Sequence, residues 1–186
     1  MTNRKDIAGT AYDPQLAKEL VEKNVYGKQR IKLLSADREN FMLMADIVQS
    51  QLPEVGFNVT IETMEWAAFL HTARAGDYDM TFLSWQNEST TGSELLYPNF
   101  HSENAGSSNR ALYNNPEFDK LVEASSMTVD QEERLNYLDQ ANAFMLEDNA
   151  IVIMNHGVVT SALSKEYEGL ELSATGQWNL KNVKRK

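Results

Sequence analysis

Cysteine is absent from the 186 residues of the sequence. Its absence excludes a thiol nucleophile, a zinc–thiolate site and a scaffold held by disulfides. Long apolar runs are missing too, since the stretch at 150–154 is far shorter than the roughly 20 residues that a membrane-spanning helix requires. The first residues are polar and no apolar segment follows them, so we expect no secretory signal in this sequence.

Positive charge is scarce over most of the chain. Residues 37–180 hold 6 basic residues against 23 acidic ones, whereas residues 181–186 hold 4 basic residues and no acidic one. The acidic body repels phosphate groups, so we expect no nucleic-acid partner. We interpret the basic C-terminal cluster as a solvated tail.

Catalytic signatures are also lacking. The sequence has no Gly-x-Ser-x-Gly elbow, no phosphate-binding loop, no dinucleotide fingerprint and no His-Glu-x-x-His motif. Asp77 and Asp79 share one face of a predicted strand, which metal ions sometimes use, but a plain strand start after Gly76 accounts for them better. We therefore predict no enzymatic activity, no metal site and no cofactor.

The first half of the chain alternates between strand and helix patterns. A capping residue followed by proline at Asp13-Pro14 predicts a first helix. Apolar runs predict strands at 30–35, 57–64 and 78–85, and apolar residues at helical spacing predict helices from 37 to about 55 and at 65–75. This alternation implies right-handed crossovers. The predicted fold class is α/β, a mostly parallel sheet flanked by helices.

The second half is less regular. Residues 86–113 are polar with a short apolar patch at 95–97, and we expect a long loop there. Caps at Asn115-Pro116 and Asp130 predict two further helices, and 150–154 and 158–163 are candidate strands, the first one buried. Residues after 165 are expected to be irregular or strand-like. The predicted domain limits are a disordered or linker N-terminus at 1–11, a ligand-binding lobe at 12–164 and a C-terminal return segment at 165–186.

One strand end stands out as a candidate binding site. Ligands of open parallel sheets bind outside the carboxyl ends of the strands. The third predicted strand leads into Trp85, Asn87 and Glu88, an aromatic face and a carboxylate that can accept hydrogen bonds from a cationic ligand. The alternative is that Trp85 belongs to the core and Glu88 to the ordinary surface, and the pattern alone leaves both open.

Several segments, taken in order, resemble the second lobe of the family 5 solute-binding proteins, the dipeptide, oligopeptide and glutathione binders of ABC transporters. The resemblance runs from the helix at 12–20 to about residue 169. The segments that carry it are Val55-Gly56-Phe57-Asn58-Val59, Gly76-Asp77-Tyr78-Asp79-Met80 leading to Trp85, Phe100-His101-Ser102, Asn109-Arg110, Tyr113-Asn114-Asn115-Pro116, Glu133-Arg134 and Asp148-Asn149-Ala150-Ile151.

The resemblance implies a single lobe of a periplasmic-binding-protein-like fold of type II. Such a lobe grips a peptide-like ligand together with a first lobe and delivers it to an ABC permease. Peptide binders usually carry Trp-x-x-Asp where this chain has Trp85 to Glu88, so the resemblance implies that Glu88 receives the ligand's amino group and Trp85 lines the adjoining pocket. Asn87 and Arg110 are weaker candidates for ligand contact.

The resemblance also sets expectations for the whole protein. We expect an extracytoplasmic location, periplasmic or as a cell-surface lipoprotein, and we expect this chain to be an excised or truncated lobe that lacks its N-terminal partner lobe. The rival cargoes are an oligosaccharide, a metal chelate or an opine, because residues 89–93 replace the Asp-Pro that usually follows the motif. A flavodoxin-like or hydrolase domain is a more distant alternative, as is a fragment that only self-associates.

Overall fold

The computed structural model describes residues 11–24, 30–86, 92–155 and 157–186. Contacts divide the described chain into two compact units. One, the sheet unit, holds residues 11–84 and 99–115, and the other, the helical unit, holds residues 85–98 and 116–186. The domain limits predicted from the sequence stay predictions.

The sheet unit confirms the predicted alternation of helices and strands. It begins with helix α1 (Pro14–Lys23), where the Asp13 carboxylate accepts a hydrogen bond from the Leu16 amide at 2.9 Å. The following elements are β1 (Arg30–Ala36), α2 (Glu39–Gln51), the short 3₁₀ helix η2 (Leu52–Val55), β2 (Asn58–Met64), α3 (Trp66–Ala75) and β3 (Met80–Thr81). Gly56 and Gly76 end η2 and α3 in the left-handed conformation that glycine adopts without strain.

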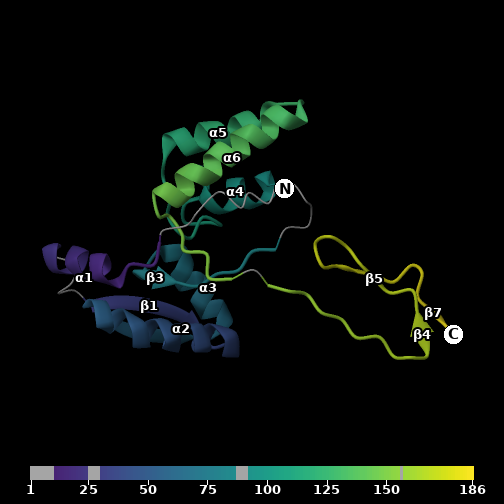
Figure 1. Cartoon of the computed structure of the whole chain (residues 1–186), viewed down its shortest axis with the longest axis horizontal. Coiled ribbons are helices and arrows are strands. Elements are labelled where there is room, and N and C mark those ends of the chain that lie inside the picture. The colour runs from purple at the N-terminus through teal and green to yellow at the C-terminus, as the bar shows by residue number, and fades with distance from the viewer. Residues whose placement is uncertain (1–10, 25–29, 87–91, 156) are drawn as a thin grey trace. The chain divides into compact units, whose positions relative to one another are not determined.

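The three strands form one parallel sheet in the order β2-β1-β3, so β1 is central. Successive residues of a strand face opposite sides of the sheet. Accordingly, Leu33 packs with Ala45 of α2, whereas Leu34 packs with Phe69 of α3. Helices therefore cover both faces of the sheet, and α2 can be followed along β1 in Figure 1. The predicted α/β class with a parallel sheet flanked by helices is confirmed.

The third strand is much shorter than the sequence predicts. The expected strand covered 78–85, but only Met80 and Thr81 pair with β1. Residues beyond them leave the sheet, and Leu83 and Trp85 are 44% and 50% exposed. An alternating apolar pattern cannot distinguish a paired strand from an extended segment that continues past the sheet.

The predicted loop at 86–113 contains a helix that sequence reasoning missed. Helix α4 (Ser93–Phe100) is followed by the 3₁₀ helix η3 (Ser102–Asn104). Leu96 and Phe100 lie four positions apart and are 4% and 7% exposed. Pro98 inside so short a helix and the polar residues around it hide this spacing in the sequence.

The helical unit contains a hairpin of two helices. Helices α5 (Pro116–Met127) and α6 (Gln131–Glu147) lie side by side (Figure 1). As predicted, Asp130 caps α6, with its carboxylate accepting a hydrogen bond from the Glu133 amide at 2.8 Å. The buried apolar residues of the hairpin are Phe118, Val122, Leu138, Ala141 and Met145. None of the described helices combines the length and the apolar character needed to cross a lipid bilayer.

The strands predicted at 150–154 and 158–163 are not present in the described residues of those ranges. The chain is extended there, and Val152 and Val158 are 78% and 86% exposed. A β-strand exists only where a neighbour completes its hydrogen bonds, and composition does not supply that neighbour. After residue 165, two short antiparallel ladders form, β4 (Tyr167–Glu168) with β7 (Lys184–Arg185) and β5 (Glu171–Leu172) with β6 (Trp178–Asn179), which confirms strand-like character.

Candidate functional site

The carboxyl ends of β1 and β2 lie together at one edge of the sheet, here called the carboxyl edge. The Asp37 amide, just after β1, donates a hydrogen bond to the Met64 carbonyl oxygen at the end of β2, at 2.8 Å. The Glu65 carboxylate accepts a hydrogen bond from the Ala67 amide at 2.9 Å and so caps α3. The turns that leave the two strands are therefore fixed to each other.

Arg38 supplies a positioned cation at this carboxyl edge. Its guanidinium carbon lies 3.6 Å from the ring centroid of Trp66, the first residue of α3. The Trp66 ring in turn stacks on Phe69, with the two centroids 5.4 Å apart. A guanidinium over an indole face is held by cation–π attraction, while its edge keeps donors for a planar anion. Arg38 is exposed and forms no ion pair with a described carboxylate.

The residues predicted around the third strand are placed only in part. Trp85 comes four residues after β3 and is 50% exposed, so its ring is not ordinary core. Asn87 and Glu88 lie outside the described residues. Their roles in ligand binding, and that of Trp85, stay predictions.

Arg110 lies at the opposite edge of the sheet, where the strands begin, here called the amino edge. The Tyr78 hydroxyl, two residues before β3, donates a hydrogen bond to the Arg110 carbonyl oxygen. Burial raises the pKa of Tyr78, while the charge of Arg110 opposes that rise. Within the sheet unit, Arg110 and Arg38 therefore stand at different ends of the strands. The predicted contact of Arg110 with a ligand stays a prediction.

Arg38 is the residue that sequence reasoning missed. The sequence shows an arginine directly after a predicted strand, at the edge where α/β proteins bind ligands. This position after the strand is the sequence signal that could have identified Arg38 as a candidate. What the sequence hides is the aromatic support, because Trp66 is 28 residues further along the chain and reaches Arg38 only through the parallel pairing of β1 with β2.

Acidic residues at the amino edge are engaged with a lysine. The Lys32 ammonium nitrogen lies 2.8 Å from an Asp77 carboxylate oxygen, and the Lys32 amide donates to Asp79 at 2.7 Å. The part of the chain that the structure describes contains no cluster of three or more His, Cys, Asp or Glu side chains able to hold a metal ion.

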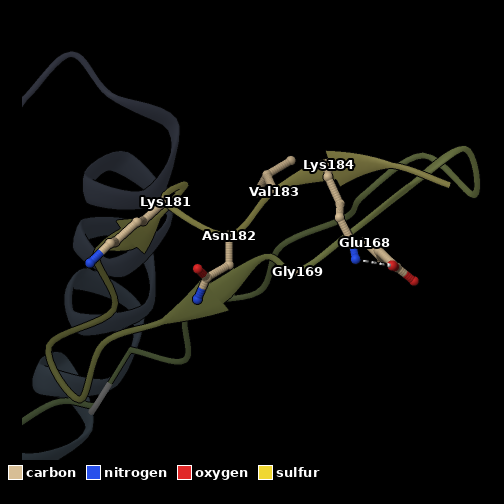
Figure 2. A pocket seen from close by; sticks show the side chains of 6 residues that line it. All are labelled: Glu168, Gly169, Lys181, Asn182, Val183 and Lys184. Carbon is tan, nitrogen blue, oxygen red and sulfur yellow. Dashed lines mark ion pairs between the residues drawn. The ribbon is translucent and has the colours of Figure 1, made fainter.

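A hollow of about 600 Å³ lies in the C-terminal segment, and none of its lining residues was predicted to bind a ligand. Its lining residues are Glu168, Gly169, Lys181, Asn182, Val183 and Lys184 (Figure 2). Lys184 already pairs with Glu168 at 3.3 Å, and most of the lining side chains are exposed. Because the hollow is formed by exposed residues of short terminal ladders, we do not assign it a ligand.

Comparison with known proteins places these features in a family. The protein named "Probable di/tripeptide-binding protein 5" of Pseudomonas aeruginosa is 26% identical over 96% of this chain and 35% of its own length. Heme-binding protein A of Haemophilus influenzae is also 26% identical, over 92% of this chain and 32% of its own length. The crystal structure of the dipeptide binding protein from Pseudoalteromonas sp. SM9913 in complex with Met-Leu superposes with a TM-score of 0.80, at 28% identity, over 94% of this chain and 36% of that one.

These relatives are binding proteins, and the chain spans about a third of the length of the curated relatives it matches. The family model described as "Bacterial extracellular solute-binding proteins, family 5 Middle" matches residues 2–107, which is more than half of the 186 residues. The match covers the whole parallel sheet, from β1 to β3, together with α4 and η3. The chain therefore belongs to the family 5 bacterial extracellular solute-binding proteins.

Proposed function

We propose that this chain is the substrate-binding lobe of an ABC-importer solute-binding protein that captures peptide-like ligands outside the cytoplasm. In this proposal the lobe closes on its ligand with a second lobe and hands the ligand to a membrane permease, without catalysing a reaction. The observation that carries the proposal is the likeness, at a TM-score of 0.80 and 28% identity, to a dipeptide-binding protein that holds Met-Leu.

The geometry of Arg38 supports a ligand with a free carboxylate. Its guanidinium is exposed, positioned by Trp66 and unpaired with any described carboxylate. Arginine binds a carboxylate through two parallel N–H···O hydrogen bonds, which fixes both position and orientation. We therefore assign Arg38 to the carboxyl group of the ligand.

The other contacts rest on the sequence. Trp85 is half exposed after β3, as an aromatic wall of a ligand pocket requires. We propose that Trp85 lines the pocket, that Glu88 accepts hydrogen bonds from the ligand's ammonium group, and that Asn87 supports this contact. A Glu at this position keeps the negative charge that an ammonium group needs.

Capped dipeptides test each assignment separately. The chain is titrated with Met-Leu, with its C-terminal amide and with its N-acetyl derivative, and binding is followed by amide NMR signals, which detect affinities down to roughly the millimolar range. We expect the amide to bind about threefold more weakly than Met-Leu, because an exposed ion pair contributes modestly. Arg38→Gln should remove the difference in affinity between Met-Leu and its amide. Glu88→Gln should remove the difference in affinity between Met-Leu and its N-acetyl form.

The matched control is Arg30→Gln, which removes an exposed arginine at the amino edge of the same strand. Arg30→Gln should leave all three affinities unchanged. The Arg38 assignment is wrong if Arg38→Gln lowers the affinity for Met-Leu and its amide equally. Absence of binding by any dipeptide, together with saturable binding of hemin, would replace the peptide by the cargo that one 26% identical relative is named for.

A further inference from the structure

A second group of basic residues lies at the amino edge of the sheet. Arg74 is in the last turn of α3, and Arg110 follows η3 in the chain. Both belong to the sheet unit. Helix α3 runs from the carboxyl edge to the amino edge, so Arg74 is displaced by about 12 Å along the helix axis from Trp66 at 1.5 Å per residue. Within the sheet unit, this group is therefore separate from Arg38.

The loop that carries Arg110 is held by a buried side chain. The Asn109 amide is fully buried, and its oxygen accepts a hydrogen bond from the Tyr113 amide at 3.2 Å. Its nitrogen donates to the carbonyl oxygens of Phe100, His101 and Tyr113, at 3.3, 3.2 and 2.8 Å. The Tyr78 hydroxyl adds a hydrogen bond to the carbonyl oxygen of Arg110 itself. The backbone at Arg110 is thus fixed before any ligand binds.

The guanidinium of Arg110 is incompletely satisfied. Its Nη1 atom is buried and has no hydrogen-bond partner among the described residues. Burial lowers the pKa of Arg110, and the positive charge of Arg74 lowers it further, while Tyr78 acts in the opposite direction. Neither arginine forms an ion pair with a carboxylate of the described residues. The loop before Arg110 reaches the end of α3, because a Cβ on Gly106 would lie 3.7 Å from the Arg74 carbonyl oxygen. Two arginines of neighbouring segments therefore lack a paired carboxylate among the described residues, and one of them has a buried Nη atom without a partner.

The acidic residues that follow Arg74 along the chain do not neutralise it. Asp77 and Asp79 follow α3 directly, but Lys32 engages both, at 2.8 and 2.7 Å. The chain carries a formal net charge of −10, so acidic side chains are abundant elsewhere. A partly buried guanidinium without an anion destabilises the fold, because its charge loses hydration and gains no partner.

We propose that Arg74 and Arg110 form a binding site for a small oxyanion, a carboxylate or a phosphate, at the amino edge of the sheet. The anion would neutralise both guanidinium groups and accept hydrogen bonds from their open N–H donors. Planar donor forks of this kind match the oxygens of carboxylate and phosphate. The site does not depend on the peptide-binding proposal, which assigns the ligand's carboxyl and ammonium groups to Arg38 and Glu88.

Anion titrations of the 186-residue chain test the site. Sodium phosphate and sodium acetate are titrated separately against sodium chloride at constant ionic strength, and the arginine side-chain Nε–H signals and the amide signals of residues 74–78 and 107–113 are followed by NMR. We expect saturable shifts with phosphate, acetate or both. Arg110→Lys keeps the charge but loses the donor fork, so the apparent Kd should rise about tenfold or more. Arg74→Gln should also weaken binding.

The control variant is Lys18→Gln, which removes an exposed cation of α1 in the same unit and should leave the anion affinity unchanged. Unchanged Asn109 and Tyr113 amide signals in Arg110→Lys establish that the loop keeps its structure. A stronger response to acetate identifies a carboxylate site, and a stronger response to phosphate identifies a phosphate site. Shifts that do not saturate, or that are equal in the wild type, Arg110→Lys and Arg74→Gln, overturn the proposal.

Discussion

Strand β1 and the stretch at 150–155 are both short and apolar, yet their surroundings differ completely. In β1, Leu33 and Leu34 are fully buried, and β2 and β3 pair with the strand on both sides. In the other stretch, Val152 and Ile153 are 78% and 51% exposed, and no described strand pairs with them. An apolar run therefore indicates a tendency to be buried but does not say what will cover it.

The difference lies in what the neighbouring sequence provides. The helix and strand that follow β1 within the next 30 residues, α2 and β2, supply both a covering face and a paired backbone. Residues 150–163 contain no Asp, Glu, Lys or Arg, so their composition favours burial. The residues that follow them pair only with each other, in ladders two residues long, and offer this stretch no neighbouring strand. Local supersecondary structure thus closes the sheet unit, whereas the stretch at 150–155 keeps its apolar side chains in solvent.

Truncation of one buried and one exposed apolar side chain should show this difference most strongly. Leu34→Ala removes a fully buried side chain from the centre of the sheet and should lower the free energy of unfolding by about 2–5 kcal/mol. Val152→Ala should change it by less than about 0.5 kcal/mol, since the side chain has little contact to lose. Urea unfolding, followed by the amide NMR signals of the unit that carries each residue, measures both.

Leu43→Ala provides the control for Leu34→Ala, because Leu43 is 59% exposed on α2 of the same unit. It should leave the stability of the sheet unit nearly unchanged, since alanine is an excellent helix former. A loss in Val152→Ala as large as that in Leu34→Ala would mean that the stretch at 150–155 is packed in solution, and the comparison of the two regions would fail.

Replacement of one glycine in the sheet unit and of one just after the stretch at 150–155 should give a smaller difference in stability. Gly76 ends α3 at φ +72°, and a Cβ there would lie 2.7 Å from the Leu112 Cδ1 atom. Gly76→Ala should lower the stability of the sheet unit by about 1–2 kcal/mol, because an L-residue is strained in this conformation. A Cβ on Gly157 would meet nothing within 4 Å, so Gly157→Ala should be nearly neutral. Thermal unfolding measures the loss of stability in both variants. A larger loss in Gly157→Ala than in Gly76→Ala would mean that the chain around Gly157 is packed in solution.

Sequence patterns predicted the sheet unit well because its signals are local. The cap at Asp13 and the apolar faces of α2 and α3 each lie within a few residues of the structure they specify. The pattern failed where the outcome depends on distant partners. The predicted strand at 150–154 needed a neighbour that composition does not reveal, and α4 was hidden by Pro98.

The same distinction applies to the candidate site. The carboxyl edge itself follows from the strand–helix order, and Trp85 was expected there from its place after the third strand. The support that Trp66 gives to Arg38 depends on the pairing of β1 with β2, and the hold of Tyr78 on Arg110 joins residues 32 positions apart. Such contacts between distant segments appear only in the folded chain.

The smallest predicted effect is the change in stability at alkaline pH that comes from one ion pair in each of the two units. The hydrogen bond from Lys32 to Asp77 raises the pKa of Lys32 above its ordinary value of 10.5, and Glu62, at 3.3 Å, adds to this rise. The folded protein then holds this proton more tightly than the unfolded chain does. The resulting stabilisation is fully present below pH 10.5 and is lost as the pH rises through the raised pKa of the folded state.

Lys32→Gln isolates this contribution. Burial raises the pKa of Tyr78 as well, so its titration also destabilises the folded state at alkaline pH, but it does so in both proteins and cancels in their difference. The urea midpoint of the wild type should exceed that of Lys32→Gln by a constant amount from pH 8 to about 10 and approach it above that range.

Lys184→Gln removes the exposed pair with Glu168 in the terminal ladder and should leave the midpoint unchanged at every pH, because both side chains stay largely solvated. A constant difference between the wild type and Lys32→Gln up to pH 11.5 would show that the lysine acts through packing of its stem, and the contrast between the two ion pairs would then rest on burial of apolar surface instead of charge.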